Sequence, residues 1–363
     1  MTDRLTLEVR KDNWADTRLV TEPLDQDLAE NEVLLRVDRQ ALTANNISYA
    51  SAGDSLGYWR FFPAEEGWGR IPAMGWADVV ASAHPDVPVG ERVWGFFPMS
   101  THLKILAGKA TAQSFVDVSP HREGLAPVYA QFDRASANPI YEQTREDQDS
   151  LLRGLFMTSW LVEDFLEVSD FFGATSCLIT SASSKTSIAL AHCVKKRGQL
   201  ISVAVTSAGN VAFCESLGCY DKVATYDQIG SLDGSEPVVM VDMAGSTGIL
   251  SDLHHQYGDN MKYSCRIGAT HLEGFGPVEG LPGATPEFFF APAHLQTRSR
   301  ELGAGEFMMR LGSAYVGFRQ FCDSWMRVEQ SYGPEAVAQV YQQVLAGKSD
   351  PASGQIISLR QER

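Results

Sequence analysis

The chain contains 363 residues, of which 44% are hydrophobic and 21% are charged. This composition is typical of a soluble globular enzyme, and the length leaves room for two domains. The formal net charge of −15 argues against a nucleic-acid-binding surface, because phosphate backbones are bound by clustered Lys and Arg.

The sequence lacks the signals of secretion and of membrane insertion. The first residues, MTDRLTLEVRKDN, are charged from the start, and no run reaches the roughly 18 apolar residues that span a bilayer. The six cysteines are scattered without CxxC spacing, which indicates free buried thiols rather than disulfides or a metal site. We therefore expect a cytoplasmic protein that binds neither nucleic acid nor membrane.

Residues 1–120 show the pattern of short strands separated by turns. Glu32–Arg39 alternates around an apolar run, which predicts a strand. A Pro/Gly turn followed by a strand is predicted within Gly69–Ser82, and Pro88 and Gly90 precede another strand that ends near Phe97. This spacing indicates a compact barrel-like β unit.

From about Asp147 the pattern changes to helices and strands in alternation. Leu151–Phe172 has apolar residues at helical spacing, and Gly173 follows as a stop signal. The next predicted elements are strand Ser176–Thr180, helix Thr186–Lys196, strand Gln199–Val205, helix Asn210–Leu217, a short hydrophobic segment at Lys222–Thr225, strand Pro237–Asp242, helix Ser246–Gln256 and strand Met261–Ile267. Such alternation is typical of a doubly wound parallel sheet.

The remaining elements of the chain are a loop, two helices and a closing strand. The Gly/Pro-rich stretch Glu273–Pro286 is predicted to be a loop. Glu301–Ser331 and Glu335–Ala346 are predicted helices, and Gly354–Arg360 is the predicted last strand.

The turn after strand Ser176–Thr180 is where a dinucleotide-binding half would hold phosphate. It runs from Ser181 to Ser187, SASSKTS, and contains no glycine. Glycines in this turn let the backbone approach a pyrophosphate closely and let the following helix pack against the sheet. Their replacement by serine, lysine and threonine keeps the turn but changes how any phosphate must be held.

Several segments together resemble the medium-chain dehydrogenase/reductase superfamily over nearly the whole chain, in its zinc-independent quinone-reductase-like branch. They are EVLLRVDRQALTANNISYASAG, VPVGERVWGF, the βαβ segment Leu178–Gln199, SLGCYDKVATYDQ and the closing QVYQQVLAGKSDPASGQIISLR. The segments VGFRQF and GATPEFFFAPAH are similar to those of a little-characterised subgroup known only as a domain of unknown function.

The resemblance implies an α/β protein with a GroES-like β-barrel domain and a Rossmann-type doubly wound parallel sheet domain. The barrel would comprise residues 1–147 and be completed by 300–363, and the Rossmann-type domain would comprise residues 148–299. The superfamily also suggests a homodimer formed through the edge of the nucleotide-binding sheet, with Lys222–Thr225 or Met261–Ile267 near that edge.

The residues at the zinc-ligand positions of related alcohol dehydrogenases do not suit zinc. Those relatives use a Cys after the first strand and a Gly-His-Glu further on; this chain has Thr43-Ala44-Asn45-Asn46 and Gly75-Trp76-Ala77 instead. Trp and Ala cannot ligate zinc. We therefore expect no metal, and we expect an acceptor already activated by conjugation, such as an enone or quinone.

The resemblance implies NADP(H) as the cofactor. Ser184, Lys185 and Ser187 replace glycines of the related reductases. Two interpretations remain open: the lysine and the hydroxyls hold the phosphates, or the turn has lost its cofactor. The second strand ends without the acidic residue that usually binds the NAD ribose, which leaves room for a 2′-phosphate. The expected cofactor-binding residues are Ser181, Ala182, Ser183, Ser184, Lys185, Thr186, Thr206, Ser207, Asn210, Ala244, Gly268 and Thr270.

The substrate pocket would draw on Thr43, Asn46 and Tyr49 of the barrel, where related reductases commonly have Asn and Asp at the first two positions. His271, after a strand, is the expected acid or base, with Tyr49 or Tyr141 as alternatives. Two interpretations of the aromatic residues also remain open. Tyr49, Tyr58, Trp59 and Trp76 would form a wall for a planar acceptor, or would be ordinary core residues.

These expectations lead to a zinc-independent oxidoreductase that transfers a hydride between NADP(H) and an activated carbonyl compound, namely an enone, quinone or ketone. Two alternatives remain. One is a divergent member that has lost hydride transfer and cleaves or hydrolyses a ketone C–C bond without nucleotide. The other is a non-catalytic ligand-binding relative.

Overall fold

The computed structural model describes residues 3–125, 127–243, 245–267 and 280–361. The chain divides into two compact units: Met1–Leu151 with Met326–Arg363, and Leu152–Trp325. Residues 300–325 therefore belong to the second unit, whereas the sequence analysis places them with the barrel. The long helix α2 (Glu146–Val168) begins in the first unit and continues into the second.

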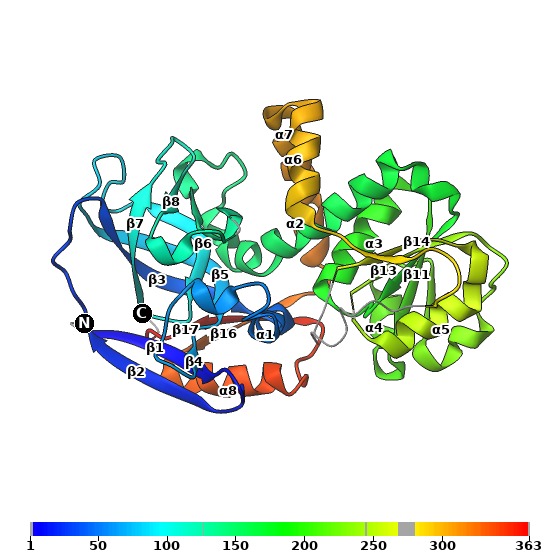
Figure 1. Ribbon diagram of the computed structural model, residues 1–363, viewed down its shortest axis with the longest axis horizontal. Helices are drawn as coiled ribbons and strands as arrows, with labels where there is room; N and C mark the ends of the chain where they lie inside the picture. Colours follow the sequence, from blue (N-terminus) through cyan, green and yellow to red (C-terminus); the bar gives the residue numbers. More distant parts are fainter. Residues whose placement is uncertain (1–2, 126, 244, 268–279, 362–363) are drawn as a thin grey trace. The chain divides into compact units, whose positions relative to one another are not determined.

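The first unit is built on an eight-stranded sheet in the order β16-β17-β3-β5-β6-β9-β8-β7, which an additional β3–β7 pairing closes. A smaller sheet has the order β2-β1-β4 (Figure 1). The strands are β1 (Asp3–Arg10), β2 (Thr17–Pro23), β3 (Glu32–Leu42), β4 (Trp68–Gly69), β5 (Pro72–Ser82), β6 (Arg92–Pro98), β7 (His102–Gly108), β8 (Ser114–Asp117), β9 (Gln131–Arg134), β16 (Arg327–Tyr332) and β17 (Ser353–Ser358). Its helices are α1 (Ala44–Ser51) and α8 (Pro334–Leu345).

Side chains that alternate along β3 divide the first unit into an inside and an outside. Val33, Leu35 and Val37 point into a core of aliphatic and aromatic residues, as the period-2 pattern of a strand with one buried face requires. Leu34 and Arg36 face the opposite side. The barrel interior is therefore a packed core, and the polar side chain of Arg36 lies on the outer face of β3.

The second unit contains a six-stranded sheet in the order β12-β11-β10-β13-β14-β15, with every neighbouring pair parallel. This is the 3-2-1-4-5-6 order of a Rossmann-type sheet. The elements are β10 (Ser176–Thr180), α3 (Lys185–Arg197), β11 (Ile201–Thr206), α4 (Val211–Ser216), β12 (Lys222–Thr225), β13 (Val238–Asp242), α5 (Thr247–Tyr257), β14 (Met261–Arg266), β15 (Pro286–Phe288), α6 (Ala291–Leu302) and α7 (Ala304–Cys322). The predicted α/β class with a barrel and a doubly wound parallel sheet is confirmed.

Two predicted helices end earlier in the structure than the sequence predicts. The predicted helix Glu301–Ser331 is wrong in its last part, because α7 ends at Cys322 and Arg327–Tyr332 forms β16. The partner decides this segment: β16 pairs with β17 in parallel along its whole length. The helix predicted at Leu151–Phe172 ends at Val168, since Asp170–Phe172 have positive φ angles that no α-helix accommodates.

The two segments expected near an edge of the parallel sheet are β12 and β14. β12 is one edge strand, and β14 lies next to the other edge strand, β15. β15 begins at Pro286, the last residue of the predicted loop Glu273–Pro286. Residues 273–279, the first half of that loop, lie outside the described residues.

Candidate functional site

The turn between β10 and α3 keeps a glycine-like backbone without glycine. Ser181, the first residue after β10, has a φ of 48°, in the left-handed region that favours glycine. Its carbonyl accepts a hydrogen bond from the Ser184 N–H at 2.8 Å, which closes the turn. A non-glycine residue in this region costs on the order of 1 kcal/mol or more. The surrounding structure therefore keeps Ser181 in a backbone conformation that serine disfavours.

Two serines of this turn, Ser184 and Ser187, are held in place by hydrogen bonds. Ser184 is the N-cap of α3, and its Oγ accepts from the Ser187 N–H at 3.1 Å. Ser187 is fully buried, and its hydroxyl donates to the Thr180 carbonyl at 2.9 Å. α3 thus begins close against β10, because a small side chain with a satisfied hydroxyl fills the contact.

A second turn, at the end of β11, joins the first through one amide. Asn210 donates from Nδ2 to Ser183 Oγ at 2.9 Å and to Ser207 Oγ at 3.1 Å. Because β10 and β11 are parallel neighbours, their carboxyl ends meet at one edge of the sheet. The structure therefore brings together expected cofactor-binding residues from both turns, and Thr206, at the end of β11, lies buried behind them.

Lys185 and Thr186 form the first turn of α3 and are half-buried. The Thr186 carbonyl accepts from Ser159 on α2 at 2.8 Å, whereas its hydroxyl has no partner within the described part of the chain. The Lys185 ammonium lies near Cys322 of α7. Burial raises the pKa of that thiol, and the lysine charge opposes the rise. A hydroxyl donor and a cation therefore stand at the helix N-terminus, where backbone N–H groups already favour an anion.

The end of β13, the strand next to β10, is held by a buried carboxylate. Asp242 Oδ1 accepts from the Thr180 hydroxyl at 2.7 Å and from the Gly245 N–H at 3.2 Å. Thr180 Oγ1 in turn accepts from the Met243 N–H at 2.9 Å. Asp242 thus fixes this strand end against β10. The other expected residues of this edge, Ala244, Gly268, Thr270 and His271, lie outside the described residues.

In the first unit, Thr43 and Asn46 form the N-terminal cap of α1. The Thr43 N–H donates to Asn46 Oδ1 at 2.7 Å, and Thr43 Oγ1 donates to the same oxygen at 3.2 Å. Asn46 is buried, and its Nδ2 donates to the Pro72 carbonyl at 2.8 Å. The Asn46 amide therefore closes the cap of α1 through Oδ1 and anchors α1 to β5 through Nδ2.

Tyr49, one turn further along α1, belongs to an aromatic cluster. Its ring centroid lies 4.8 Å from that of Tyr58 and 5.4 Å from that of Phe96. The Tyr58 hydroxyl donates to the Tyr129 hydroxyl at 3.3 Å. Burial raises the pKa of Tyr49, with a smaller contribution from Tyr129. Tyr49 is thus a protonated phenol at neutral pH, and sequence reasoning missed Tyr129 because it lies far away in the chain.

The wall expected from four aromatic residues does not form as one surface. Tyr49 and Tyr58 lie together, but Trp59 packs in a different cluster, with Leu7 and Tyr341. Trp76 is fully buried and donates from Nε1 to the Glu146 carbonyl at 3.0 Å. The neighbouring residues Tyr58 and Trp59 pack into two different hydrophobic clusters. The spacing of aromatic residues in the sequence does not predict this separation.

Tyr141, the alternative acid, lies beside Trp76, with ring centroids 5.2 Å apart. Its hydroxyl donates to Glu146 Oε1 at 2.9 Å. Burial, followed by this carboxylate, raises the pKa of Tyr141 to about 12. Tyr141 therefore already has an acceptor for its proton within the first unit. Across the described ranges, no group of three or more His, Cys, Asp or Glu side chains is arranged to hold a metal ion.

Comparison with known proteins places the chain in a family. The family described as protein of unknown function (DUF2855) matches residues 40–350. The chain belongs to this family. No curated protein matches the sequence of this DUF2855 chain.

Solved structures share the fold of the DUF2855 chain over its full length. The putative NADPH:quinone reductase from Mesorhizobium loti has a TM-score of 0.62 at 12% identity, with 99% of each chain covered. CurA from Vibrio vulnificus in complex with NADPH has a TM-score of 0.60 at 11% identity, covering 99% of this chain and 100% of that one. The Etr1p/NADP/crotonyl-CoA complex has a TM-score of 0.59 at 14% identity, with the same coverage. The coverage and the TM-scores establish a shared architecture, and at these low identities the comparison establishes the fold alone.

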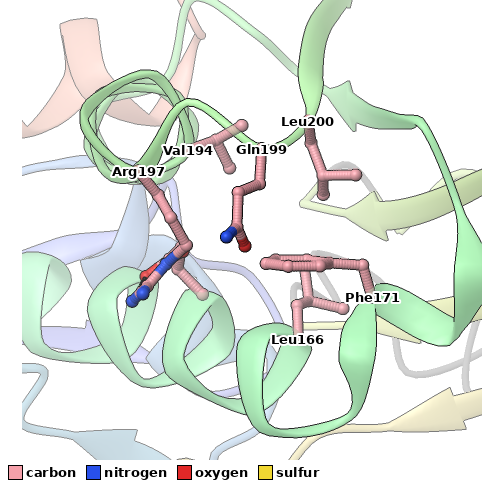
Figure 2. Close-up of a pocket in the computed structure, with 7 residues that line it drawn as sticks. Leu166, Phe171, Val194, Arg197, Gln199 and Leu200 are labelled. Atoms are coloured by element: carbon pink, nitrogen blue, oxygen red, sulfur yellow. Dashed lines mark hydrogen bonds and ion pairs between the residues drawn. The ribbon is translucent and has the colours of Figure 1, made fainter.

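One hollow of the second unit of the DUF2855 chain is not a ligand site. It lies among α2, α3 and the residues just before β11, where Phe171 faces Leu166, Gln199 and Leu200 (Figure 2). It leaves no space for a water molecule. Arg197 at its rim is paired with Glu163, its Nη2 lying 2.8 Å from Oε2.

No described helix combines the length and apolar character needed to cross a membrane.

Proposed function

We propose that this DUF2855 protein is a zinc-independent oxidoreductase that transfers a hydride between NADP(H) and an activated carbonyl compound such as an enone, quinone or ketone. The observation that carries the proposal is the β10–α3 turn, which keeps the left-handed conformation at Ser181 and places hydroxyl and ammonium groups at a helix N-terminus. The shared fold supports it, since CurA and Etr1p bear NADPH and NADP in their complexes.

The residues of the turn fit a nucleotide that is held by side chains rather than by close approach of the backbone. Thr186, Lys185 and the N-terminus of α3 would hold the pyrophosphate. Ser183, Ser207 and Asn210 would contact the adenosine ribose and its 2′-phosphate. The absence of an acidic residue in Val205–Asn210 removes the group that would repel a 2′-phosphate. When bound, the nicotinamide supplies or accepts the hydride.

On the substrate side, we propose Tyr49 as the donor of the proton that follows hydride transfer. Its raised pKa keeps the phenol protonated at neutral pH, and its position in an apolar cluster with Tyr58 and Phe96 suits a planar acceptor. Thr43 and Asn46 would position Tyr49, since they cap the helix that carries it. His271 stays the alternative donor.

Nucleotide binding tests the proposal most directly. NADPH fluorescence and the thermal midpoint should both rise when NADPH is added to the full chain. Lys185→Ala and Thr186→Val should each weaken NADPH binding, the lysine variant by roughly 10- to 100-fold because a charge-assisted contact is lost. Lys195→Ala is the matched control, since Lys195 lies on the same helix and pairs with Asp221. Lack of any response to NADPH would refute the proposal.

Turnover experiments separate the proposed reaction from its alternatives. Consumption of NADPH with crotonyl-CoA or a quinone, reduced strongly in Tyr49→Phe, would support hydride transfer and the proton donor. Loss of a ketone substrate without nucleotide would instead indicate C–C cleavage or hydrolysis. Neither reaction, together with specific ligand binding, would indicate a non-catalytic relative. We also propose a homodimer, which light scattering of the full chain tests.

A further inference from the structure

A polar cavity of about 270 Å³ lies on the outer face of the barrel, entirely within the first unit. Leu34 and Arg36 of β3 line it, on the face opposite the core residues Leu35 and Val37. Its remaining lining residues are Leu24, Gln26, Val80, Ala81, His102 and Arg360. None of these belongs to the residues proposed for the nucleotide or for proton donation.

Arginine dominates the charge of this cavity. Arg36 donates from Nη2 to Asp78 Oδ2 at 3.0 Å, but its Nε is buried without a partner among the described residues. The other oxygen of Asp78 accepts from Arg92 at 3.1 Å, and Arg92 also pairs with Asp38 and Glu146. Asp78 is thus the carboxylate partner of Arg36, and Arg360 is the second arginine of the lining.

The arginines of the cavity affect the titration of His102, which lies beside them. The residue is 7% exposed, and its ring has one hydrogen-bond partner in the described part of the chain, Thr101 Oγ1, at 3.1 Å from Nδ1. Burial first, and then the charges of Arg360 and Arg36, lower the pKa of His102 to about 4. The ring is therefore neutral at pH 7 and has a second nitrogen available for a ligand.

The rim of the cavity is held in place, so the space is built rather than accidental. Leu24 and Gln26 line the cavity, and Asp25 between them accepts from Lys104 of β7 at 2.8 Å. Lys104 Nζ also lies 3.3 Å from Glu32 Oε2, at the start of β3. The nearby carboxylates of Asp25 and Glu32 are thus paired with a lysine, and they do not neutralise the arginines.

We propose that this cavity binds the anionic group, a carboxylate or a phosphate, of a small molecule. Arg36 and Arg360 supply the positive charge, and His102 supplies a hydrogen bond. An unpartnered guanidinium nitrogen in a confined space is the arrangement that charge-assisted, often bidentate, contacts with such anions satisfy. In a chain with a net charge of −15, this local positive field selects for anions in spite of the overall repulsion.

Calorimetric titration of the full chain with inorganic phosphate and with succinate tests the proposal, and the tighter of the two identifies the preferred group. Arg360→Gln should weaken the binding of that anion by roughly tenfold or more, because one charge-assisted contact is lost. Arg327→Gln is the control: it removes the same charge from an exposed arginine of the same unit that pairs with Asp350, and it should leave binding unchanged.

A measurement on the unaltered protein guards against a variant that fails to fold. The imidazole resonances of His102, identified by their loss in His102→Gln, should shift on addition of the anion, while those of the exposed His255 stay in place. Saturable binding with this localised shift supports the site. Absence of binding by both anions, equal weakening in Arg360→Gln and Arg327→Gln, or binding without a His102 shift would each overturn it.

Discussion

Asp117 and Arg122 form a buried ion pair whose removal has a calculable cost. Their side chains are 2% and 4% exposed, and Arg122 Nε lies 3.0 Å from Asp117 Oδ2. Asp117 also accepts from the Ser119 hydroxyl and N–H. The arginine lies over the rings of Phe61 and Phe62, and burial lowers its pKa in spite of the carboxylate. Asp117 therefore stabilises the charged form of the buried Arg122.

Asp117→Asn should lower the free energy of unfolding by about 3–5 kcal/mol, the usual cost of leaving one charge of a buried pair alone. A Coulomb estimate agrees, since two charges roughly 4 Å apart at an effective dielectric constant of about 20 attract by ~4 kcal/mol. Urea unfolding followed by tryptophan fluorescence measures the change. The readout suits this unit, because it contains Trp14, Trp59, Trp68, Trp76 and Trp94.

Two controls complete the experiment on this pair. In Asp117→Asn/Arg122→Met both charges are gone and an apolar chain lies against the two phenyl rings, so most of the loss should be recovered. Asp350→Asn breaks an exposed pair with Arg327 and should change stability by less than about 1 kcal/mol. A loss below about 1 kcal/mol in Asp117→Asn, or a double variant no more stable than the single one, would refute the reasoning.

Three further predictions concern the backbone and acid stability. Ser181→Gly should raise the free energy of unfolding by up to ~1 kcal/mol in urea unfolding, because glycine accepts the positive φ, whereas Ser181→Ala should give no such gain. Gly53→Ala should destabilise by more than ~2 kcal/mol, since its Cβ would lie 2.0 Å from Trp59 Nε1; Gly317→Ala in open space on α7 should instead stabilise by ~1 kcal/mol. Burial lowers the pKa of His192 from 6.5 to about 4, so its contribution to stability is present above pH 6.5 and is lost as the pH falls toward 4, a loss that His192→Gln should reduce in pH-dependent melting.

The parallel sheet is the part of the fold that local sequence patterns describe best. The predicted strand Ser176–Thr180 coincides with β10, and the predicted helix Thr186–Lys196 differs from α3 by one residue at each end. Both elements carry strong local signals: a short apolar run, and a serine N-cap followed by a glycine at the C-cap. The meeting of Ser183 with Asn210 follows from the same topology, because neighbouring parallel strands end at one edge.

Other elements depended on partners that the sequence does not name. Arg327–Tyr332 is mostly polar, and all but its last residue belongs to the predicted helix Glu301–Ser331, but pairing with β17 makes it a strand. The packing of the aromatic residues also depends on residues that are distant in the sequence. Tyr58 packs with Tyr129, whereas Trp59 fits between Gly53 and Gly69 in another core. Side chains of adjacent residues point to different cores, and only the complete barrel decides which.

By itself, the sequence determined the α/β class, the two kinds of sheet and the place of the glycine-free turn, because apolar periodicity and turn residues act over short stretches of chain. The tertiary structure decided what the turn does with its serines. Ser187 is buried against Thr180, Ser184 caps α3, and Ser181 is held at a positive φ. These outcomes depend on contacts between strands and helices that form only when the sheet is assembled, and the same holds for the arginine-lined cavity outside the barrel.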